Sequence, residues 1–255
     1  MTGEPDDKPE QGVEQYGRQP WPDAEAFLAN GEVCLVGRMP WSSNATFLVE
    51  VTGEHGGEGA TAHGIYKPHQ GERPLWDFPD GLYQREVAAY AMSEGLGWRL
   101  VPPTVVADGP LGVGSLQWFV DADFEQHYFT LYEQRRYHRQ LQAICAFDLV
   151  VNNTDRKGGH CLIDPREHIW AIDNGLAFHA EFKLRTVIWE FGGDPVPEDL
   201  LEDLQDLLDA GLPTELNDLL DPFEREAIRA RARALIQERR FPVDHTGRRF
   251  PWPVV

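Results

Sequence analysis

Short stretches of apolar and β-branched residues fill the first half of the chain, and longer stretches with helical spacing fill the second half. The short stretches are bounded by Gly, Pro, Asn and Ser, which is typical of strands. The predicted strands are 32–37, 45–51, 61–67, 101–106 and 114–120. A hairpin loop is expected over 38–44, and the Gly- and Glu-rich segment 52–59 is expected to form a flexible hairpin tip.

Helical periodicity appears first over 81–94, where Val87, Tyr90 and Ala91 recur at the spacing of one helix face. The longest helix is predicted over 132–151. The segment 197–240 is acidic and helical, and a stripe of leucines predicts a face packed on the core. The stripe consists of Leu200, Leu201, Leu204, Leu207 and Leu208.

Composition fits a globular protein that buries a sizeable core, with 255 residues of which 42% are hydrophobic. The residues 1–20 are polar and rich in Gly and Pro, so they are expected to be a disordered lead-in. No signal peptide or membrane-length apolar run is found. Cys34, Cys145 and Cys161 are expected to be free thiols, the first two buried in apolar runs, and the protein is predicted to be cytoplasmic.

The formal net charge is −19, which lowers the odds of two classes of partner. A nucleic-acid-binding protein usually carries a basic surface, and this chain has none overall. Anionic lipid would also repel it, so stable membrane association is not expected. The motifs of α/β-hydrolases, zincins, P-loop proteins and Rossmann folds are absent from the sequence.

Two acidic loops, each following an apolar run, carry the strongest chemical signal. The first is Asn152 to His160, with Asp155 at its centre, and the second is Ile172-Asp173-Asn174-Gly175. Kinase-type sites need one carboxylate to orient and deprotonate the acceptor hydroxyl, and another to hold a metal ion on the nucleotide phosphates. The two aspartates are eighteen residues apart, which leaves room for a short strand pair that lets them converge.

A lysine and a glutamate complete this kinase-type order. Lys67 ends the third predicted strand, and Glu86 lies nineteen residues later on the first long predicted helix. Such an ion pair aims the ammonium group at nucleotide phosphates. We therefore predict an α+β, two-lobed, protein-kinase-like fold, with a strand-rich N-lobe over 21–120 and a helix-rich C-lobe over 121–255.

The run Asn153-Thr154-Asp155-Arg156 and the later Asp173-Asn174-Gly175-Leu176-Ala177-Phe178 resemble the type II phosphatidylinositol 4-kinases. More broadly, they resemble the phosphatidylinositol 3/4-kinase-like superfamily found in bacteria. The resemblance covers about residues 33–180. The segment after Phe178, where kinases usually choose their acceptor, shows no recognisable pattern.

The resemblance implies specific roles. Asp155 would act on the acceptor hydroxyl, Arg156 would hold its loop, and Asp173 would bind Mg²⁺. The nucleotide would be held by a serine-bearing phosphate loop, by the Lys67–Glu86 pair and by the backbone of a hinge strand. The implied nucleotide-binding residues are Ser42, Ser43, Asn44, Lys67, Glu86, Gln117, Trp118, Phe119 and Val120.

His160 stands where protein kinases carry a metal-binding Asn, five residues after the catalytic Asp. Imidazole suits Mn²⁺ better than Mg²⁺. We predict His160 as a metal ligand, with Asn153 or Asn174 as alternative second ligands. His63 and His69 flank the lysine strand, but no carboxylate or Cys completes a metal-binding spacing in the sequence.

Three functions remain open from the sequence. The first is an ATP-dependent phosphotransferase that acts on an unidentified hydroxyl acceptor, either a protein Ser/Thr or a small inositol-type alcohol. A protein acceptor is a serious alternative because HipA-like protein kinases share a similar Asn-x-Asp-Arg-His loop. The second is a nucleotide-binding pseudokinase, supported by His160 alone. The third is an interaction protein that acts through its acidic C-terminal helices.

Overall fold

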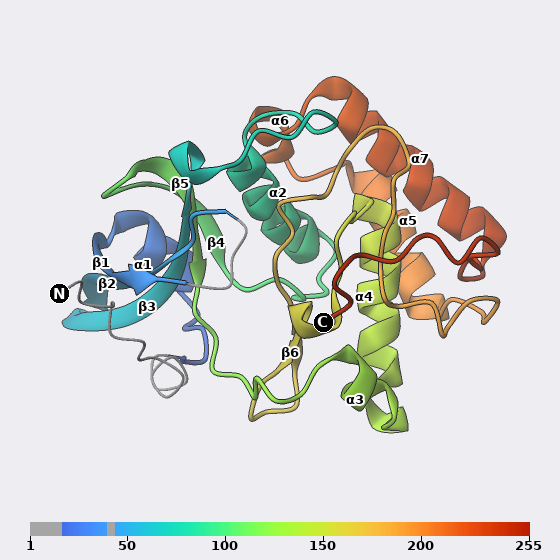
Figure 1. Cartoon of the computed structure of the whole chain (residues 1–255), viewed down its shortest axis with the longest axis horizontal. Helices are drawn as coiled ribbons and strands as arrows, with labels where there is room; N and C mark the ends of the chain where they lie inside the picture. Colours follow the sequence, from blue (N-terminus) through green and yellow to red (C-terminus); the bar gives the residue numbers. More distant parts are fainter. Residues whose placement is uncertain (1–16, 40–43) are drawn as a thin grey trace, which may run out of the picture.

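The computed structural model describes residues 17–39 and 44–255, and these form two lobes (Figure 1). Each lobe has its own hydrophobic core. One core lies between the main sheet and a short helix, and the other lies among the long helices. The predicted two-lobed, α+β, kinase-like fold is therefore confirmed.

The N-lobe contains a five-stranded antiparallel sheet with the order β1-β2-β3-β5-β4. The strands are β1 (Glu32–Arg38), β2 (Phe47–His55), β3 (Glu58–Pro68), β4 (Thr104–Gly109) and β5 (Gly112–Trp118). Helix α1 (Ala24–Asn30) covers the sheet, because Phe27 and Leu28 pack with Val49 and Val51 of the central strands. At the C-terminal end of β3, Lys67 lies at the boundary between the lobes, because it contacts Asp173 of the C-lobe.

The expected flexible tip over 52–59 is wrong. The strands β2 and β3 stay paired as far as His55 and Glu58, and only Gly56 and Gly57 form the turn. Their φ angles are +62° and +84°. A two-residue turn with both φ angles positive suits the right-handed twist of a hairpin, and glycine adopts that conformation without steric cost.

Two further predictions, the start of β4 and the burial of Cys34, are wrong. Strand β4 begins at Thr104 rather than at residue 101, because Pro102 and Pro103 have no N–H group to donate to a sheet. Strand β1 lies at the sheet edge with most of its side chains exposed, so Cys34 is exposed rather than buried. Cys145 and Cys161 are buried free thiols.

Helix α2 (Leu82–Gly95) follows β3 after the short 3-10 helix η2 (His69–Gly71). Its buried residues Ala88, Ala89 and Met92 belong to the core of the C-lobe. Arg85, buried on the same helix, forms an ion pair with Glu224 at the start of the last long helix. Helix α2 is therefore anchored to the C-lobe.

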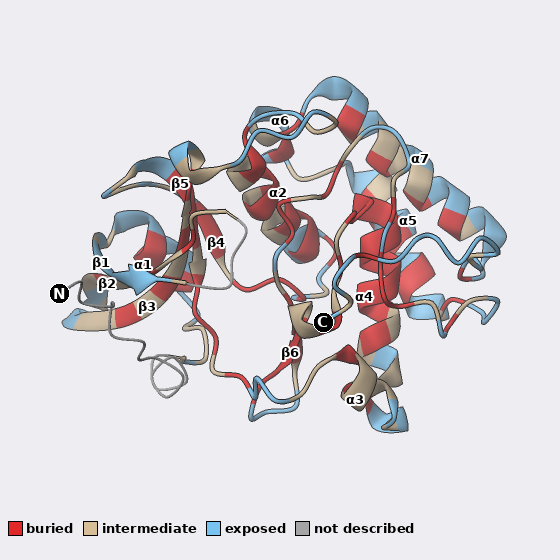
Figure 2. Ribbon diagram, viewed as in Figure 1, coloured by how far each residue is buried: buried red, intermediate tan, exposed pale blue. Residues whose placement is uncertain are grey.

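The C-lobe is mainly helical, with a two-stranded sheet beside the acidic loops. Its elements are α3 (Tyr128–Tyr132), η3 (Arg135–Tyr137), α4 (His138–Val151), η4 (Gly158–His160), β6 (Cys161–Ile163), β7 (Ile169–Ala171), α5 (Glu198–Ala210), α6 (Leu216–Leu219) and α7 (Pro222–Glu238). Figure 2 shows α4 buried along most of its length and α7 exposed on its outer face. Because α4 is apolar on nearly all sides, it forms the centre of this lobe.

The helix predicted over 132–151 is interrupted. The ring of His138 stacks on Tyr132 with centroids 4.7 Å apart, and its Nε2 lies 2.7 Å from the Tyr132 carbonyl oxygen. In a continuous helix the Tyr132 carbonyl would accept a hydrogen bond from a backbone N–H of the next turn. Here it contacts the His138 ring instead, and α3 ends at Tyr132. In α5, Leu200, Leu201, Leu204 and Leu207 are buried as predicted, whereas Leu208 is half-buried.

None of the helices in the described part of the chain is both long enough and apolar enough to cross a bilayer.

Candidate active site

Lys67 lies at the end of β3 and contacts two carboxylates. Its Nζ forms an ion pair with Glu86 of α2 and lies 2.7 Å from Oδ1 of Asp173. Burial lowers the pKa of Lys67, but the charges of Asp173 and Glu86 outweigh it and hold the pKa above its ordinary value. The lysine is therefore charged, and it joins the two lobes.

Glu86 is almost fully buried, with 4% of its side chain exposed. One of its oxygens pairs with Lys67 and the other accepts a hydrogen bond of 2.9 Å from the backbone N–H of Asn174. The predicted Lys67–Glu86 pair is thus present, and Glu86 also fixes the loop of Asp173.

Asp173 lies two residues after the end of β7 and adopts a left-handed backbone conformation with φ of +57°. A non-glycine residue in this region is uncommon and is often found at functional sites. The positive charge of Lys67 is the main reason that the pKa of Asp173 falls below its usual range. The carboxylate is therefore ionised, as a metal ligand must be.

Asp155 lies on the loop after α4 with 26% of its side chain exposed. Its Oδ2 is 3.1 Å from Nζ of Lys157. Both residues line a cavity of about 460 Å³ that Lys67 and Asp173 also line. The structure therefore brings the two predicted carboxylates and two lysines together in one cavity.

Helix α4 ends at Val151 and is followed by its C-cap residue Asn152, whose φ is +57°. The Asn152 amide group donates to the carbonyl oxygens of His179 and Glu181, and its oxygen accepts from the N–H of Lys183. Asn tolerates the left-handed conformation better than most residues. This single side chain thus ties the start of the Asp155 loop to the segment that follows Asp173.

Arg156 is fully buried, so it cannot touch a substrate. Its guanidinium group pairs with Asp148 at 2.9 Å and donates to the Ile172 carbonyl at 2.6 Å and to Oδ1 of Asn174 at 2.7 Å. The resemblance implied that Arg156 holds the loop of the catalytic residue Asp155. Its burial makes it a positioning residue that locks the two acidic loops to each other.

The surroundings of Asn153 and Asn174 argue against a role for either as the alternative metal ligand. Both are fully buried, and their side-chain oxygens accept hydrogen bonds from within the loops. Oδ1 of Asn153 accepts from the N–H of Asp155 at 2.9 Å, and Oδ1 of Asn174 accepts from Arg156. Their role is to shape the loops.

His160 is close to the predicted metal ligand Asp173, with its Nε2 3.4 Å from Oδ2. Its Nδ1 accepts a hydrogen bond of 3.3 Å from the backbone N–H of Lys157. Burial lowers the pKa of His160 to about 4, so the ring is neutral at pH 7. A neutral ring that accepts at Nδ1 carries its proton on Nε2, which then donates toward Asp173.

A second cavity of about 240 Å³ adjoins the first, and Thr46, Lys67, His160 and Asp173 line both. Its other walls are mostly apolar. They are formed by Met39, Ile65, Gln117, Trp118, Phe119, Val120, Phe124, Leu162 and Ile172. The cavity lies where the sequence predicted the adenine site.

The hinge differs from prediction in detail. The backbone N–H groups of Trp118 and Phe119 donate to Pro103 and His63, and the Phe119 carbonyl accepts from Arg18. The Trp118 indole ring packs toward Trp21 and Phe27, in the core of the N-lobe. These groups are therefore already satisfied, and within the described part of the chain Val120 is the hinge residue whose backbone makes no hydrogen bond.

Of the predicted phosphate loop, Ser42 and Ser43 lie outside the described residues. Asn44 lines the larger cavity, and its Oδ1 accepts a hydrogen bond of 3.1 Å from the backbone N–H of Arg73. Gln117 lines the smaller cavity and donates from Nε2 to the Thr104 hydroxyl at 2.9 Å.

Two features of the site were missed from the sequence. Lys157 could have been found, because a cation two residues after the catalytic carboxylate falls in the same loop. The segment at Trp252 and Pro253 gave no signal, yet both residues line the larger cavity and Trp252 is 88% exposed. The Val254 carbonyl accepts a 2.7 Å hydrogen bond from the N–H of Gly158, which holds this segment beside the catalytic loop.

Comparisons with known proteins agree with this geometry. Residues 104–230 match the family model for phosphatidylinositol 3- and 4-kinase. Protein Rv2133c of Mycobacterium tuberculosis (strain ATCC 25618 / H37Rv) is 38% identical over 269 residues, which cover 91% of this chain and 95% of the relative.

Two solved structures share the fold at low identity. The Golgi casein kinase with Mn/ADP bound has a TM-score of 0.56 and 14% identity, covering 91% of this chain and 80% of the kinase. The hydra Fam20 structure with sugar has a TM-score of 0.51 and 12% identity, and the match covers 84% of this chain and 86% of the Fam20 chain. The chain therefore belongs to the same family as Protein Rv2133c, and the match of residues 104–230 places it in the phosphatidylinositol 3- and 4-kinase-like superfamily, as a kinase with a two-lobed fold.

Proposed function

We propose that the protein transfers the γ-phosphate of ATP to a hydroxyl group. The observation that carries this proposal is the position of Lys67, whose ammonium group contacts both Glu86 and Asp173 at the cavity that also holds Asp155. The pseudokinase alternative rested on His160 alone. The ionised Asp173 and the exposed part of Asp155 favour an active enzyme.

The two adjoining cavities fit the two ends of a nucleotide. The smaller one has the apolar walls that an adenine ring needs, with Val120 at the hinge. The larger one contains Lys67 and Lys157, whose charges suit the phosphates. A kinase of similar fold has been solved with Mn/ADP bound, which supports this assignment.

Asp173 is the residue that would hold Mg²⁺ or Mn²⁺. Its carboxylate faces the larger cavity, and oxygen is the ligand that Mg²⁺ prefers. Bound there, the ion would neutralise charge on the phosphates. His160 stays a predicted ligand for Mn²⁺, but its Nε2–H now favours a different role, in which it orients Asp173.

Asp155 would accept the proton of the attacking hydroxyl. The acceptor would enter the larger cavity on the side of Asp155 and Trp252. The walls of this cavity are compatible with a protein Ser/Thr or with a small alcohol such as an inositol, and both remain proposals.

The direct test is incubation of the purified chain with labelled ATP, using Mg²⁺ and Mn²⁺ separately, and measurement of phosphate release and autophosphorylation. ATP binding without turnover in either metal would favour the pseudokinase, and absence of ATP binding would remove the kinase assignment for this site.

We expect Glu86→Gln to raise the KM for ATP by about tenfold. The Gln side chain keeps the shape of Glu86 and its hydrogen bond to Asn174, but it removes one of the two negative charges that position Lys67. A charge-assisted hydrogen bond of this kind contributes about 1.5–3 kcal/mol. Steady-state kinetics against ATP measure the effect. Glu94→Gln, on the same helix but outside both site cavities, is the matched control. An unchanged KM would mean that the pair has no part in nucleotide binding.

The pH profile should depend on Lys157. Burial raises the pKa of Asp155 above its usual range, and the hydrogen bond and charge of Lys157 draw it back down. Activity needs the ionised carboxylate, so it falls as the pH drops through this pKa. Lys157→Met removes the opposing effect, and the acid limb of the kcat profile should move by about one unit to higher pH. Lys183→Met, which removes a more distant lysine, should leave the acid limb of the kcat profile unchanged. If both variants shifted the acid limb equally, a specific effect of Lys157 on Asp155 would be excluded.

A further inference from the structure

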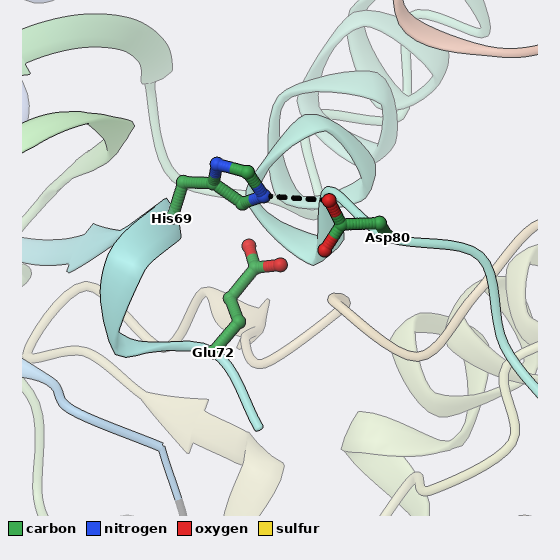
Figure 3. A group of neighbouring side chains, drawn as sticks. All are labelled: His69, Glu72 and Asp80. Carbon is green, nitrogen blue, oxygen red and sulfur yellow. Dashed lines mark hydrogen bonds and ion pairs between the residues drawn. The ribbon is translucent and has the colours of Figure 1, made fainter. Parts of the chain in front are cut away.

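His69, Glu72 and Asp80 lie together at the junction between β3 and α2. Figure 3 shows their side chains converging, with His69 on η2 and Asp80 just before α2. One ligand atom from each residue lies within 4.8 Å of the other two. In residues 17–39 and 44–255 this is the one group of three His, Cys, Asp or Glu side chains arranged in that way.

The donor set is one imidazole nitrogen and two carboxylates. Bond lengths to Zn²⁺ are about 2.0–2.2 Å for such ligands, which places them about 3.4 Å apart in a tetrahedral site. The Nε2 of His69 is 3.0 Å from Oδ2 of Asp80. Small side-chain rotations would therefore complete a three-ligand site that leaves a fourth position for water.

Glu72 is oriented by bonds that leave it free to bind a cation. Its two oxygens accept hydrogen bonds of 2.8 and 2.7 Å from the backbone N–H groups of Leu82 and Tyr83, at the start of α2. Each carboxylate oxygen can accept more than one bond, so a lone pair remains on each. Hydrogen bonds of this kind fix the orientation of metal ligands.

The simpler explanation is a surface ion pair between His69 and Asp80, with Glu72 acting only as an acceptor for the N–H groups at the start of α2. It leaves the charge of Glu72 beside that of Asp80, where like charges repel. A divalent cation would neutralise both carboxylates. Imidazole favours Zn²⁺ over Mg²⁺ or Ca²⁺, which prefer oxygen ligands.

We propose that His69, Glu72 and Asp80 form a transition-metal site for Zn²⁺, separate from the nucleotide metal expected at Asp173. The site would close the segment 69–80, which links the strand of Lys67 to the helix of Glu86. This segment also contacts the phosphate loop, because Gly71 and Arg73 bond to Ala45 and Asn44. A bound ion would therefore set the position of Lys67 and Asn44 relative to α2.

Zinc binding to the full chain, treated with chelator and free of nucleotide, tests the proposal. Isothermal titration with Zn²⁺ should give one site per chain, and His69→Ala and Asp80→Asn should each weaken it by about tenfold or more. His55→Ala is the matched control, because His55 also pairs with an aspartate, Asp23, but is not part of a three-ligand group. In the wild type, Zn²⁺ should also slow amide hydrogen exchange in the segment 72–81.

Asp173→Asn separates this site from the catalytic one, because it should leave zinc binding unchanged. Absence of Zn²⁺ binding, or binding that survives His69→Ala, would overturn the proposal. Binding that is lost in Asp173→Asn but kept in His69→Ala would place the ion in the catalytic cavity instead. None of these results depends on finding the phosphate acceptor.

Discussion

Asp155→Asn should reduce phosphate transfer by roughly 100- to 10,000-fold and leave ATP affinity within about twofold of the wild type. The amide has the shape of the carboxylate but cannot accept a proton. Because Asp155 contacts Lys157 rather than Lys67, its loss does not disturb the Lys67–Glu86–Asp173 contacts that are proposed to hold the nucleotide.

Single-turnover transfer and equilibrium ATP binding should be measured on the same preparations. Asp173→Asn should behave differently, since it removes the proposed metal ligand and a partner of Lys67, and both turnover and metal-dependent ATP binding should fall. Asp206→Asn, an exposed change on α5, is the control for general effects of charge. If Asp155→Asn turned over ATP at the wild-type rate, Asp155 would not be the catalytic base.

Arg156→Met should lower the free energy of unfolding by about 3–5 kcal/mol, because it leaves Asp148 buried without its counter-ion. Both side chains have no exposed surface. Burial raises the pKa of Asp148, which shows the cost of leaving a charge at this position. Chemical denaturation followed by circular dichroism measures the change.

The double variant Arg156→Met with Asp148→Leu separates stability from activity. With both charges replaced by apolar groups, most of the lost stability should return. Activity should stay low, because Arg156 also holds the Ile172 carbonyl and Asn174, and so sets the position of Asp173. Recovery of activity together with stability would mean that Arg156 acts only through folding.

The sequence predicted the residues whose signal is local. Asp155 and Asp173 stand in short motifs after apolar runs, and Lys67 and Glu86 lie at the strand–helix spacing of a kinase N-lobe. The structure brings these four residues to one cavity. Their chemical roles stay predictions until the variants are measured.

What the sequence could not predict depends on contacts between distant segments. The backbone groups of Trp118 and Phe119 at the hinge are already hydrogen-bonded, in part because the backbone N–H of Arg18, about a hundred residues earlier, donates to the Phe119 carbonyl. His69 lacked a carboxylate at a recognisable spacing, yet the fold brings Asp80 to 3.0 Å from it. The exposure of Cys34 follows from the edge position of its strand, and the apolar run around it did not reveal that position.

The ion pair between Arg85 and Glu224 bears on how this kinase can be controlled. Many protein kinases are switched off by moving the helix that carries the glutamate partner of the lysine. Here Arg85 stands next to Glu86, and Glu224 also caps α7, accepting from the backbone N–H of Asp221 at 3.0 Å. An outward swing of α2 would separate these two buried charges as well as Lys67 and Glu86. Moving this helix therefore costs the free energy of a second buried ion pair, which favours the conformation in which Lys67 and Glu86 are paired.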